Sequence, residues 1–564
     1  MKHLKPSSLA DILAVAVPVA LVLPCCYSCL LDTLSFAGIM AGVLLPLGVL
    51  MILAAISRNT PRTSVLMFPL MFIGAFQIVV SYLYHDGSPI GVDMFLNLRT
   101  TNMEEASELL ESLIDPVVFV TILYLPLLIA STIAWIHHKL AAESIMRRAR
   151  RIGIIIALTG ATATAYSVLC EPSFRIMSNI FPLNALDNLV EAVNRQRLLS
   201  DFNTTTQTFS YDAITSRADK PEVYIAVIGE TSRADNWELL GYDRHTNPRL
   251  SLYGDSLMAF RKVFSESNTT HKSVPMLLNT LSARSFKSGI YKHKSIIAAF
   301  NQAGFSTNFI SVQKPNKSLI DRYAGEADKL KYLKGRGDLV ALDQTVLPTV
   351  DSILADKSSR KKLIVIHTYG SHYNYSDRYP ATFAAFRPDR HKQADYKYRR
   401  ELMNAYDNTI VYTDYVLSEL IARIKRADCD AALIYTSDHG EDIFDDERNN
   451  FLHASPVPTY WQLHVPLLIY MNGSYSSSHP EYVSTALANR SRQASSSKSF
   501  SQTLLQIAGI RTKYNDYTSS LVSEKFASPQ KLYFLNDHNN DIDLSRWGFT
   551  GLDKSKLTKL RAEK

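Results

Sequence analysis

The sequence predicts an α/β protein with an apolar helical part in front of it, and two observations carry this prediction. The first 170 residues contain five apolar segments, each close to the roughly 20 residues that a membrane-spanning helix needs. From about residue 220, short apolar runs rich in β-branched and aromatic residues alternate with helical stretches. This alternation is typical of a mostly parallel sheet that helices cover on both faces.

The five apolar segments predict a transmembrane domain over residues 1–170. They run over 9–31, 34–56, 64–84, 116–136 and 152–170. The first is too long, and too soon followed by another, for a cleaved signal peptide. Lys and Arg are concentrated at the N-terminus and in the second and fourth loops, which places these parts on the cytoplasmic side. The loop 85–115 and everything after Cys170 are then expected to face outward.

The later apolar runs predict a second domain over residues 220–564. Buried parallel strands are expected at 223–228, 306–310, 363–366, 432–435 and 467–470, and helices are expected at 294–303 and 398–424. Residues 171–219 are interpreted as a linker. Apolar residues at helical spacing over 184–199 predict a helix there that lies along a membrane surface. The Ser-rich stretch 491–501 is expected to be an exposed loop.

Charge and cysteine content argue against three classes of protein. The formal net charge of +7 is modest for 564 residues and there is no dense Lys/Arg tract, so a nucleic-acid partner is not expected. Three of the five cysteines lie in the first apolar segment, and only Cys170 and Cys429 lie elsewhere. This pattern fits neither a disulfide framework nor a zinc ribbon.

Carboxylate and imidazole side chains follow three of the predicted strands. Glu230 follows the strand at 223–228, His372 follows 363–366, and Asp438 and His439 follow 432–435, with His453 further along. Ligands of open α/β sheets bind beyond the carboxyl ends of the strands, and these side chains suit zinc. Each residue alone has a structural explanation, but their joint position predicts a metal site.

Thr270 is the candidate nucleophile. It lies in a run of hydroxyl residues before Pro275 and an apolar stretch, which indicates the start of a helix. The free backbone N–H groups at a helix start suit a phosphate, and coordination to a metal would activate a hydroxyl. A helix N-cap without chemistry is the alternative interpretation of this threonine.

Taken together, these motifs resemble those of the lipid phosphoethanolamine transferases of Gram-negative bacteria, which include the mobile colistin-resistance enzymes. The motifs are Gly229-Glu230-Thr231-Ser232-Arg233-Ala234-Asp235, Gly241-Tyr242, Thr270 five residues before Pro275, Asn404-Ala405-Tyr406-Asp407-Asn408 and Ser437-Asp438-His439-Gly440-Glu441. The resemblance covers nearly the whole chain. It implies a five-helix transmembrane domain followed by a soluble domain of the sulfatase/alkaline-phosphatase type, with a central, mostly parallel sheet.

The resemblance also implies roles for individual residues. Glu230, Thr270, Asp438 and His439 match the ligands of one tightly bound zinc ion, and Thr270 matches the residue that carries the phosphoethanolamine group. Substrate contacts, and a second zinc site near the two histidines, are implied for residues His372, His453, Lys317, Asn97, Thr101 and Glu105. The last three recur every four residues in the outward loop, which would place them on one face of a helix.

The activity so implied is transfer of phosphoethanolamine from phosphatidylethanolamine to an envelope glycolipid, with lipid A or the lipopolysaccharide core as the expected acceptor. A monomer in the inner membrane with its catalytic domain in the periplasm is expected, and polymyxin protection is expected for a lipid A acceptor. One departure is that no cysteine flanks Thr270, whereas relatives hold this loop with a disulfide. Either packing holds the loop here, or the protein belongs to a cysteine-poor branch of the family.

Several alternatives stay open at this point. They are transfer to another periplasmic glycan, a phosphoglycerol transferase of the lipoteichoic-acid-synthase kind, and a non-catalytic membrane module. A true sulfatase is disfavoured, because Ser273-Val274-Pro275 begins the sulfatase motif but Leu277 stands where that motif has Arg. A transporter is disfavoured because the spans contain almost no ionisable residues.

Overall fold

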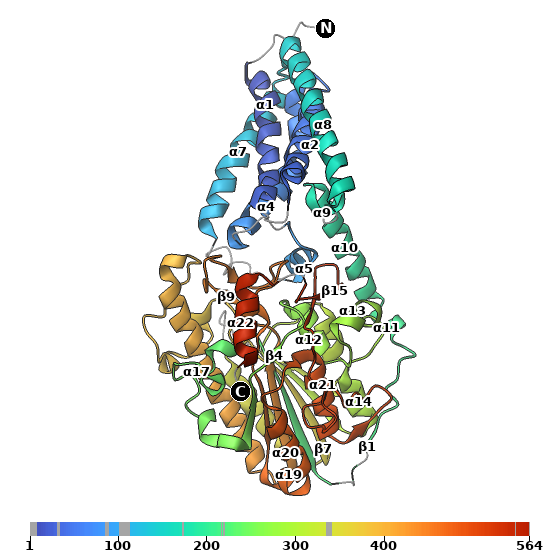
Figure 1. Cartoon of the computed structure of the whole chain (residues 1–564), viewed down its shortest axis with the longest axis vertical. Coiled ribbons are helices and arrows are strands. Elements are labelled where there is room, and N and C mark those ends of the chain that lie inside the picture. Colours follow the sequence, from blue (N-terminus) through green and yellow to red (C-terminus); the bar gives the residue numbers. More distant parts are fainter. Residues whose placement is uncertain are drawn as a thin grey trace. The chain divides into compact units, whose positions relative to one another are not determined.

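The computed structural model describes residues 8–30, 34–84, 89–100, 113–171, 174–215, 217, 220–333, 341–546 and 549–562. The chain forms two compact units. The first comprises Met1–Arg99, Met103–Asn194 and Asp446–Asn450, and the second comprises Thr100–Asn102, Arg195–Asp445 and Phe451–Lys564. The predicted fold class, an apolar helical part followed by an α/β domain, is confirmed (Figure 1).

The described part of the first unit is mainly helical. Four of its described helical segments are long and apolar enough to cross a membrane: Ser8–Cys26, which contains α1 (Ser8–Val22) and the start of the 3-10 helix η1 (Leu23–Leu30), α2 (Phe36–Ala54), α7 (Ile114–Ile136) and α8 (Glu143–Cys170). Between them α3 (Thr60–Leu66) and α4 (Phe68–Tyr84) form a pair bent by 53°, which makes a fifth span if the pair crosses as one. The predicted span 64–84 lies within this bent pair.

Glycines bring α2 and α8 into close contact. A Cβ atom on Gly48 would lie 2.3 Å from the backbone nitrogen of Ala157, and one on Gly160 would lie 2.3 Å from that of Leu45. Small residues at such positions allow the backbones of membrane helices to approach closely. The shorter helices of this part of the chain are α5 (Val92–Thr100), α9 (Ile176–Asn179) and α10 (Leu183–Ser200), which contains the helix predicted over 184–199.

The second unit is built on a seven-stranded sheet in the order β3-β11-β8-β2-β7-β5-β6. Its strands are β2 (Glu222–Gly229), β3 (Leu257–Phe260), β5 (Ser306–Ser311), β6 (Lys329–Tyr332), β7 (Lys361–His367), β8 (Asp430–Ser437) and β11 (Leu467–Met471). From β8 through β6 the strands are parallel. All eight residues of β2 are buried, which explains its continuous apolar run, since helices cover both faces of such a sheet.

Helices flank this sheet on either side. In Figure 1, α17 (Arg399–Lys425) lies on one side of the sheet, and α14 (Ile296–Gln302) and α21 (Ser496–Ile507) lie on the other. Tyr224, Ala226 and Ile228 of β2 share a core cluster with residues of α14 and α21. The remaining helices are α11 (Phe202–Thr205), α12 (Thr270–Leu277), α13 (Ala283–Gly289), α15 (Leu319–Ala324), α16 (Leu347–Ala355), α18 (Tyr460–Leu463), α19 (Gly473–Ser478), α20 (Pro480–Asn489) and α22 (Gly551–Ala562).

Pairs of short strands join loops around the sheet. They are β1 (Ile214–Thr215) with β13 (Ile510–Arg511), β4 (Val263–Phe264) with β12 (Ala494–Ser495), β9 (Asp442–Ile443) with β10 (Phe451–Leu452), and β14 (Tyr533–Leu535) with β15 (Asp541–Asp543).

Two expectations from the sequence are wrong. The strand predicted at 467–470 is β11, and it pairs antiparallel with both β3 and β8 rather than parallel. After β8 the chain forms β9, β10 and α18 and then re-enters the sheet without a long crossover helix, so β11 runs back against β8. A fully buried strand is apolar in either direction, and its composition therefore does not reveal its orientation.

The Ser-rich stretch 491–501 is not an exposed loop. From Ser496 it forms the first half of α21, and the four serines at 496, 497, 499 and 501 are each at most 2% exposed. The hydroxyl of Ser497 donates to the carboxylate of Glu266, and that of Ser501 donates to the carbonyl of Lys498 at 3.3 Å. Buried hydroxyls are tolerated when they are hydrogen-bonded, and a serine-rich composition alone does not distinguish the two cases.

Candidate metal centre

Glu230 is the first residue after β2, and its carboxylate accepts three hydrogen bonds. The side chain is 1% exposed. Oε1 accepts from the hydroxyls of Thr231 at 3.0 Å and Thr270 at 2.9 Å, and Oε2 accepts from Nε2 of Gln313 at 2.9 Å. Thr231 has a φ of 59°, so the backbone turns sharply where it leaves the sheet.

Asp438 and His439 follow β8, the strand that pairs with β2. Oδ1 of Asp438 accepts from the backbone N–H groups of Thr231 at 3.0 Å and of His439 at 2.7 Å. Oδ2 lies 3.3 Å from Nε2 of His439. Nδ1 of His439 lies 2.8 Å from the carbonyl of Gly440 and donates to it, which leaves a lone pair on Nε2 for an electrophile.

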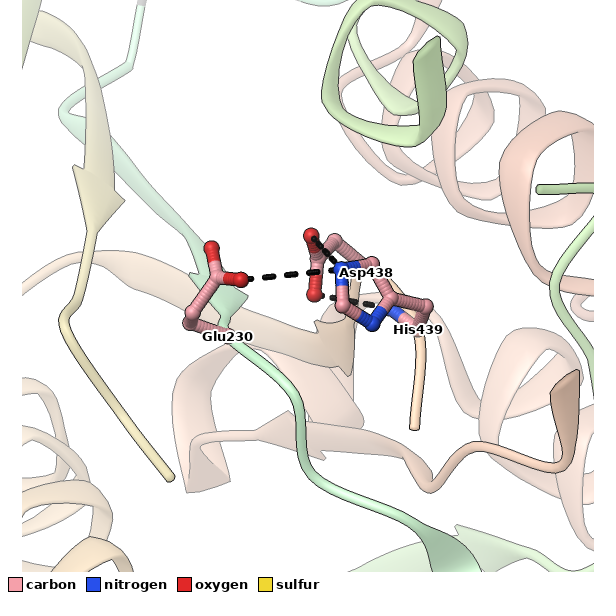
Figure 2. A group of neighbouring side chains, drawn as sticks. All are labelled: Glu230, Asp438 and His439. Atoms are coloured by element: carbon pink, nitrogen blue, oxygen red, sulfur yellow. Dashed lines mark hydrogen bonds and ion pairs between the residues drawn. The ribbon is translucent and has the colours of Figure 1, made fainter. Parts of the chain in front are cut away.

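Glu230, Asp438 and His439 form one group. A ligand atom from each lies within 4.8 Å of the others, and all three side chains are buried. Figure 2 shows the three side chains turned toward one another. Burial and the Asp438 carboxylate raise the pKa of Glu230 to about 8, and burial raises the pKa of Asp438 to about 7. Two buried carboxylates and an imidazole nitrogen suit a zinc ion, whose positive charge would offset theirs.

The hydroxyl of Thr270 lies against this group. Thr270 is the first residue of α12, after the N-cap Thr269. Its Oγ1 donates to Glu230 Oε1 at 2.9 Å and lies 3.1 Å from Nε2 of His439. A side chain held this way presents a hydroxyl oxygen to any ion that the three residues bind.

Two further histidines lie near the group. The ring of His453 lies 4.2 Å from that of His439 and 6.2 Å from that of His372, centroid to centroid. Nδ1 of His453 lies 3.3 Å from Oε2 of the buried Glu441. Burial lowers the pKa of His372 to about 3, so this imidazole is neutral near pH 7.

Of the other predicted substrate contacts, Lys317 alone has a described side chain. Lys317 is exposed, with a φ of 59°, and its backbone N–H donates to Asp321 in the turn before α15. Asn97 belongs to α5, but its side chain lies outside the described part of the chain, as do Thr101 and Glu105.

Two residues near Glu230 were not predicted from the sequence. Gln313 lies after β5, and its Nε2 also donates to the carbonyl of Thr368 at 2.8 Å. His367 ends β7, and its Nε2 lies 4.0 Å from Glu230 Oε2. Burial lowers the pKa of His367 to about 4. Both stand at the carboxyl edge of the sheet, so the rule that indicated Glu230 and Asp438 could have found them.

The chain is similar in sequence to proteins of one known family. Residues 222–510 match the sulfatase family. The Kdo(2)-lipid A phosphoethanolamine 7''-transferase of Escherichia coli (strain K12) is 30% identical over 273 residues, which are 47% of this chain and 47% of that protein. The chain thus spans about half the length of the curated relatives it matches in this way.

Two solved structures are similar to the chain. The C-terminal periplasmic domain of EcEptC from Escherichia coli, in complex with Zn, superposes with a TM-score of 0.54 at 25% identity and covers 59% of this chain and 95% of that one. The integral membrane lipooligosaccharide phosphoethanolamine transferase A (EptA) from Neisseria meningitidis superposes with a TM-score of 0.70 at 19% identity, over 92% of this chain and 98% of that one. The second likeness extends the shared fold to the helical unit. The zinc complex and the buried Glu/Asp/His group together support zinc as the metal.

Proposed function

The chain belongs to the sulfatase family, and from this premise we propose that it is a zinc-dependent phosphoethanolamine transferase with Thr270 as its nucleophile. The observation that carries the proposal is the position of the Thr270 hydroxyl, which is hydrogen-bonded to Glu230 and close to His439. The name of the Escherichia coli relative supports phosphoethanolamine as the group that is transferred.

Glu230, Asp438 and His439 would hold the zinc ion, which would lower the pKa of the Thr270 hydroxyl and stabilise negative charge on a phosphoryl group. The hydroxyl proton has an acceptor at hand, since Glu230 Oε1 lies 2.9 Å from Oγ1. Thr270 attacks the phosphorus of phosphatidylethanolamine, so that an O–P bond to Thr270 forms and the P–O bond to diacylglycerol breaks. The N–H groups of the first turn of α12 favour the phosphate position.

His453 is the proposed proton donor to the diacylglycerol oxygen. Its Nδ1 faces Oε2 of Glu441 at 3.3 Å, which orients the ring. His372 is neutral near pH 7 and is assigned to hydrogen bonding with the phosphate, or to a second zinc ion, rather than to supplying positive charge.

In a second displacement an oxygen of the acceptor forms a bond to the phosphorus, the O–P bond to Thr270 breaks, and the Thr270 oxygen takes up the proton that the acceptor releases. The acceptor proposed is lipid A or the lipopolysaccharide core. Asn97, Thr101, Glu105 and Lys317 are proposed to contact the donor. The apolar helices of the first unit would keep the enzyme, as a monomer, in the inner membrane with its second unit in the periplasm, where an anchored domain meets lipid substrates at high effective concentration.

The covalent step can be tested by intact-mass analysis of the detergent-solubilised protein after incubation with phosphatidylethanolamine. The wild type should gain the mass of one phosphoethanolamine group, and Thr270→Ala should gain none. Thr269→Ala is a matched control, because Thr269 is the neighbouring hydroxyl and its side chain makes no capping hydrogen bond to the helix. An unmodified wild type under turnover would contradict the covalent step. Faster release of diacylglycerol from phosphatidylglycerol than from phosphatidylethanolamine would favour a phosphoglycerol transferase instead.

A further inference from the structure

The segment that carries Thr270 is contacted by the C-terminal end of the chain, beyond the region that matches the sulfatase family. That match ends at residue 510. The hairpin of β14 and β15 and its turn, residues 533–543, lie after it and reach the nucleophile helix α12. We call these residues the C-terminal hairpin.

The contact on α12 is made by Lys272, two residues after Thr270. Lys272 is 2% exposed, and its ammonium donates to the backbone carbonyl of Asn536 at 2.9 Å. A buried ammonium is costly unless hydrogen bonds replace its water. The partner of Lys272 therefore matters more than that of an exposed lysine.

The turn between β14 and β15 is held in a conformation in which its backbone carbonyls accept hydrogen bonds from Lys272 and Arg195. Oδ1 of Asn536 accepts from the N–H groups of His538 at 3.0 Å and Asn540 at 2.9 Å. Asn539 has a φ of 54°, a conformation that Asn tolerates better than most residues. The next carbonyl, that of Asp537, accepts from the guanidinium of Arg195. Side-chain hydrogen bonds thus fix the backbone that faces Lys272.

Neighbouring contacts hold the residues before Thr270. The N–H group of Leu535 in β14 donates to the carbonyl of Glu266 at 2.9 Å. The amide of Asn268 donates to the carbonyl of Ser455 at 2.8 Å and to Gln462 at 2.6 Å. Cys170 and Cys429 are free thiols, and both lie far from this loop in sequence. Hydrogen bonds, not a disulfide involving these cysteines, fix the loop.

From these contacts we infer that Lys272 is a positioning residue, and that the C-terminal hairpin holds α12 so that the Thr270 hydroxyl stays against Glu230 and His439. The inference rests on the proposed function of Thr270. Positioning matters because a misplacement of about 1 Å can lower a rate by about 100-fold. Lys272 acts through the helix, because its ammonium is hydrogen-bonded to the turn of the C-terminal hairpin.

The test uses the full-length, zinc-loaded protein and three variants. Lys272→Met keeps the apolar stem and removes the donor, and Lys272→Arg restores a donor. Lys287→Met is the matched control. Lys287 lies on the exposed surface of α13, and its ammonium donates to Oδ1 of Asn540, in the same turn, at 2.9 Å. The measurements are kcat and KM for phosphatidylethanolamine, bound zinc, and hydrogen–deuterium exchange of residues 268–277.

Lys272→Met should lower kcat by about 10- to 100-fold, with KM within about twofold, zinc retained and faster exchange over 268–277. Lys272→Arg should recover at least part of the kcat, and Lys287→Met should behave like the wild type. A kcat within twofold of wild type for Lys272→Met would overturn the inference. An equal loss in Lys272→Met and Lys287→Met would also overturn it, because that would indicate general destabilisation.

Asn536→Ala is a second, independent variant. It removes the side chain that shapes the turn, and it leaves the sequence of α12 unchanged. If Lys272→Met does not fold, Asn536→Ala must show the same fall in kcat and faster exchange over 268–277, or the inference fails. If the wild type transfers no phosphoethanolamine, the proposed function fails separately. The exchange over 268–277 then decides whether the hairpin positions α12.

Discussion

Lowering the pH from 8 to 6 should weaken zinc binding to the Glu230–Asp438–His439 group by more than about tenfold, since two of the three ligands must lose a proton to bind. Burial places the pKa of Glu230 at about 8 and that of Asp438 at about 7. Zinc binds the ionised carboxylates, so affinity is highest above these pKa values and is lost as the pH falls through them. The pKa of His439 is lowered well below its ordinary value by burial, so this ligand has no proton to lose in the range.

The magnitude follows from the fraction of each carboxyl that is ionised. Between pH 8 and pH 6 the ionised fraction falls about 50-fold for Glu230 and about 10-fold for Asp438. The two carboxyls titrate as a coupled pair, so the factors are not multiplied, and a change of more than about tenfold is expected. The assay is a competition titration against a chelator of known pH dependence, with the purified protein at half-unit steps of pH.

Glu230→Gln is the control, because glutamine has nearly the same shape and no proton to release. Zinc should bind this variant more weakly at every pH, and the number of protons released on binding should fall by about one. A change in wild-type affinity of less than about tenfold between pH 8 and 6, or an unaltered proton count in the variant, would refute the reasoning.

Three further predictions concern the fold and the site. Gly370→Ala should lower the free energy of unfolding by about 2 kcal/mol or more and reduce bound zinc, because Gly370 has a φ of 52° and a Cβ there would lie 2.6 Å from the carbonyl oxygen of Glu230. Denaturant unfolding measures this, with Gly473→Ala, where nothing lies within 4 Å, as a control that should stay near wild type. Glu441→Gln should lower kcat by about tenfold or more with zinc retained, since His453 loses the carboxylate that faces its Nδ1; an unchanged kcat would contradict the role of His453. Gly48→Val should lower the Tm of the detergent-solubilised protein, because the Cβ would lie 2.3 Å from the backbone of Ala157 in α8; an unchanged Tm would show that the two helices separate freely.

The central strands of the sheet could be predicted because burial on both faces leaves a local signal. β2, β7 and β8 are fully buried, and each is apolar along most of its length, which sets it apart from the amphipathic helices. β6 was not predicted, because three of its four residues are exposed and two of them are lysines. The antiparallel direction of β11 was also missed, since direction depends on how the chain returns to the sheet.

The metal-site residues could be predicted from the sequence for a similar reason. Glu230, Asp438 and His439 directly follow buried strands, and adjacent parallel strands bring their carboxyl ends together. Lys272 gave no such signal. Its partner is a backbone carbonyl 264 residues away, and every residue has a carbonyl, so no side-chain pattern marks the contact. The sequence indicated only that something other than a flanking disulfide must hold the Thr270 loop.

The buried carboxylates explain why the loops around the site are fixed so heavily. Two such groups within one cluster repel each other and lose hydration, which is why protonation is favoured at Glu230 and Asp438 up to about pH 7 or 8. Donors from the surrounding backbone and side chains, among them Thr231 and Gln313, offset part of this cost. A loop free to move would relieve the repulsion by separating the carboxylates, and the metal site would be lost. Fixed loops instead keep the carboxylates together, so that a zinc ion stabilises the folded domain when it binds.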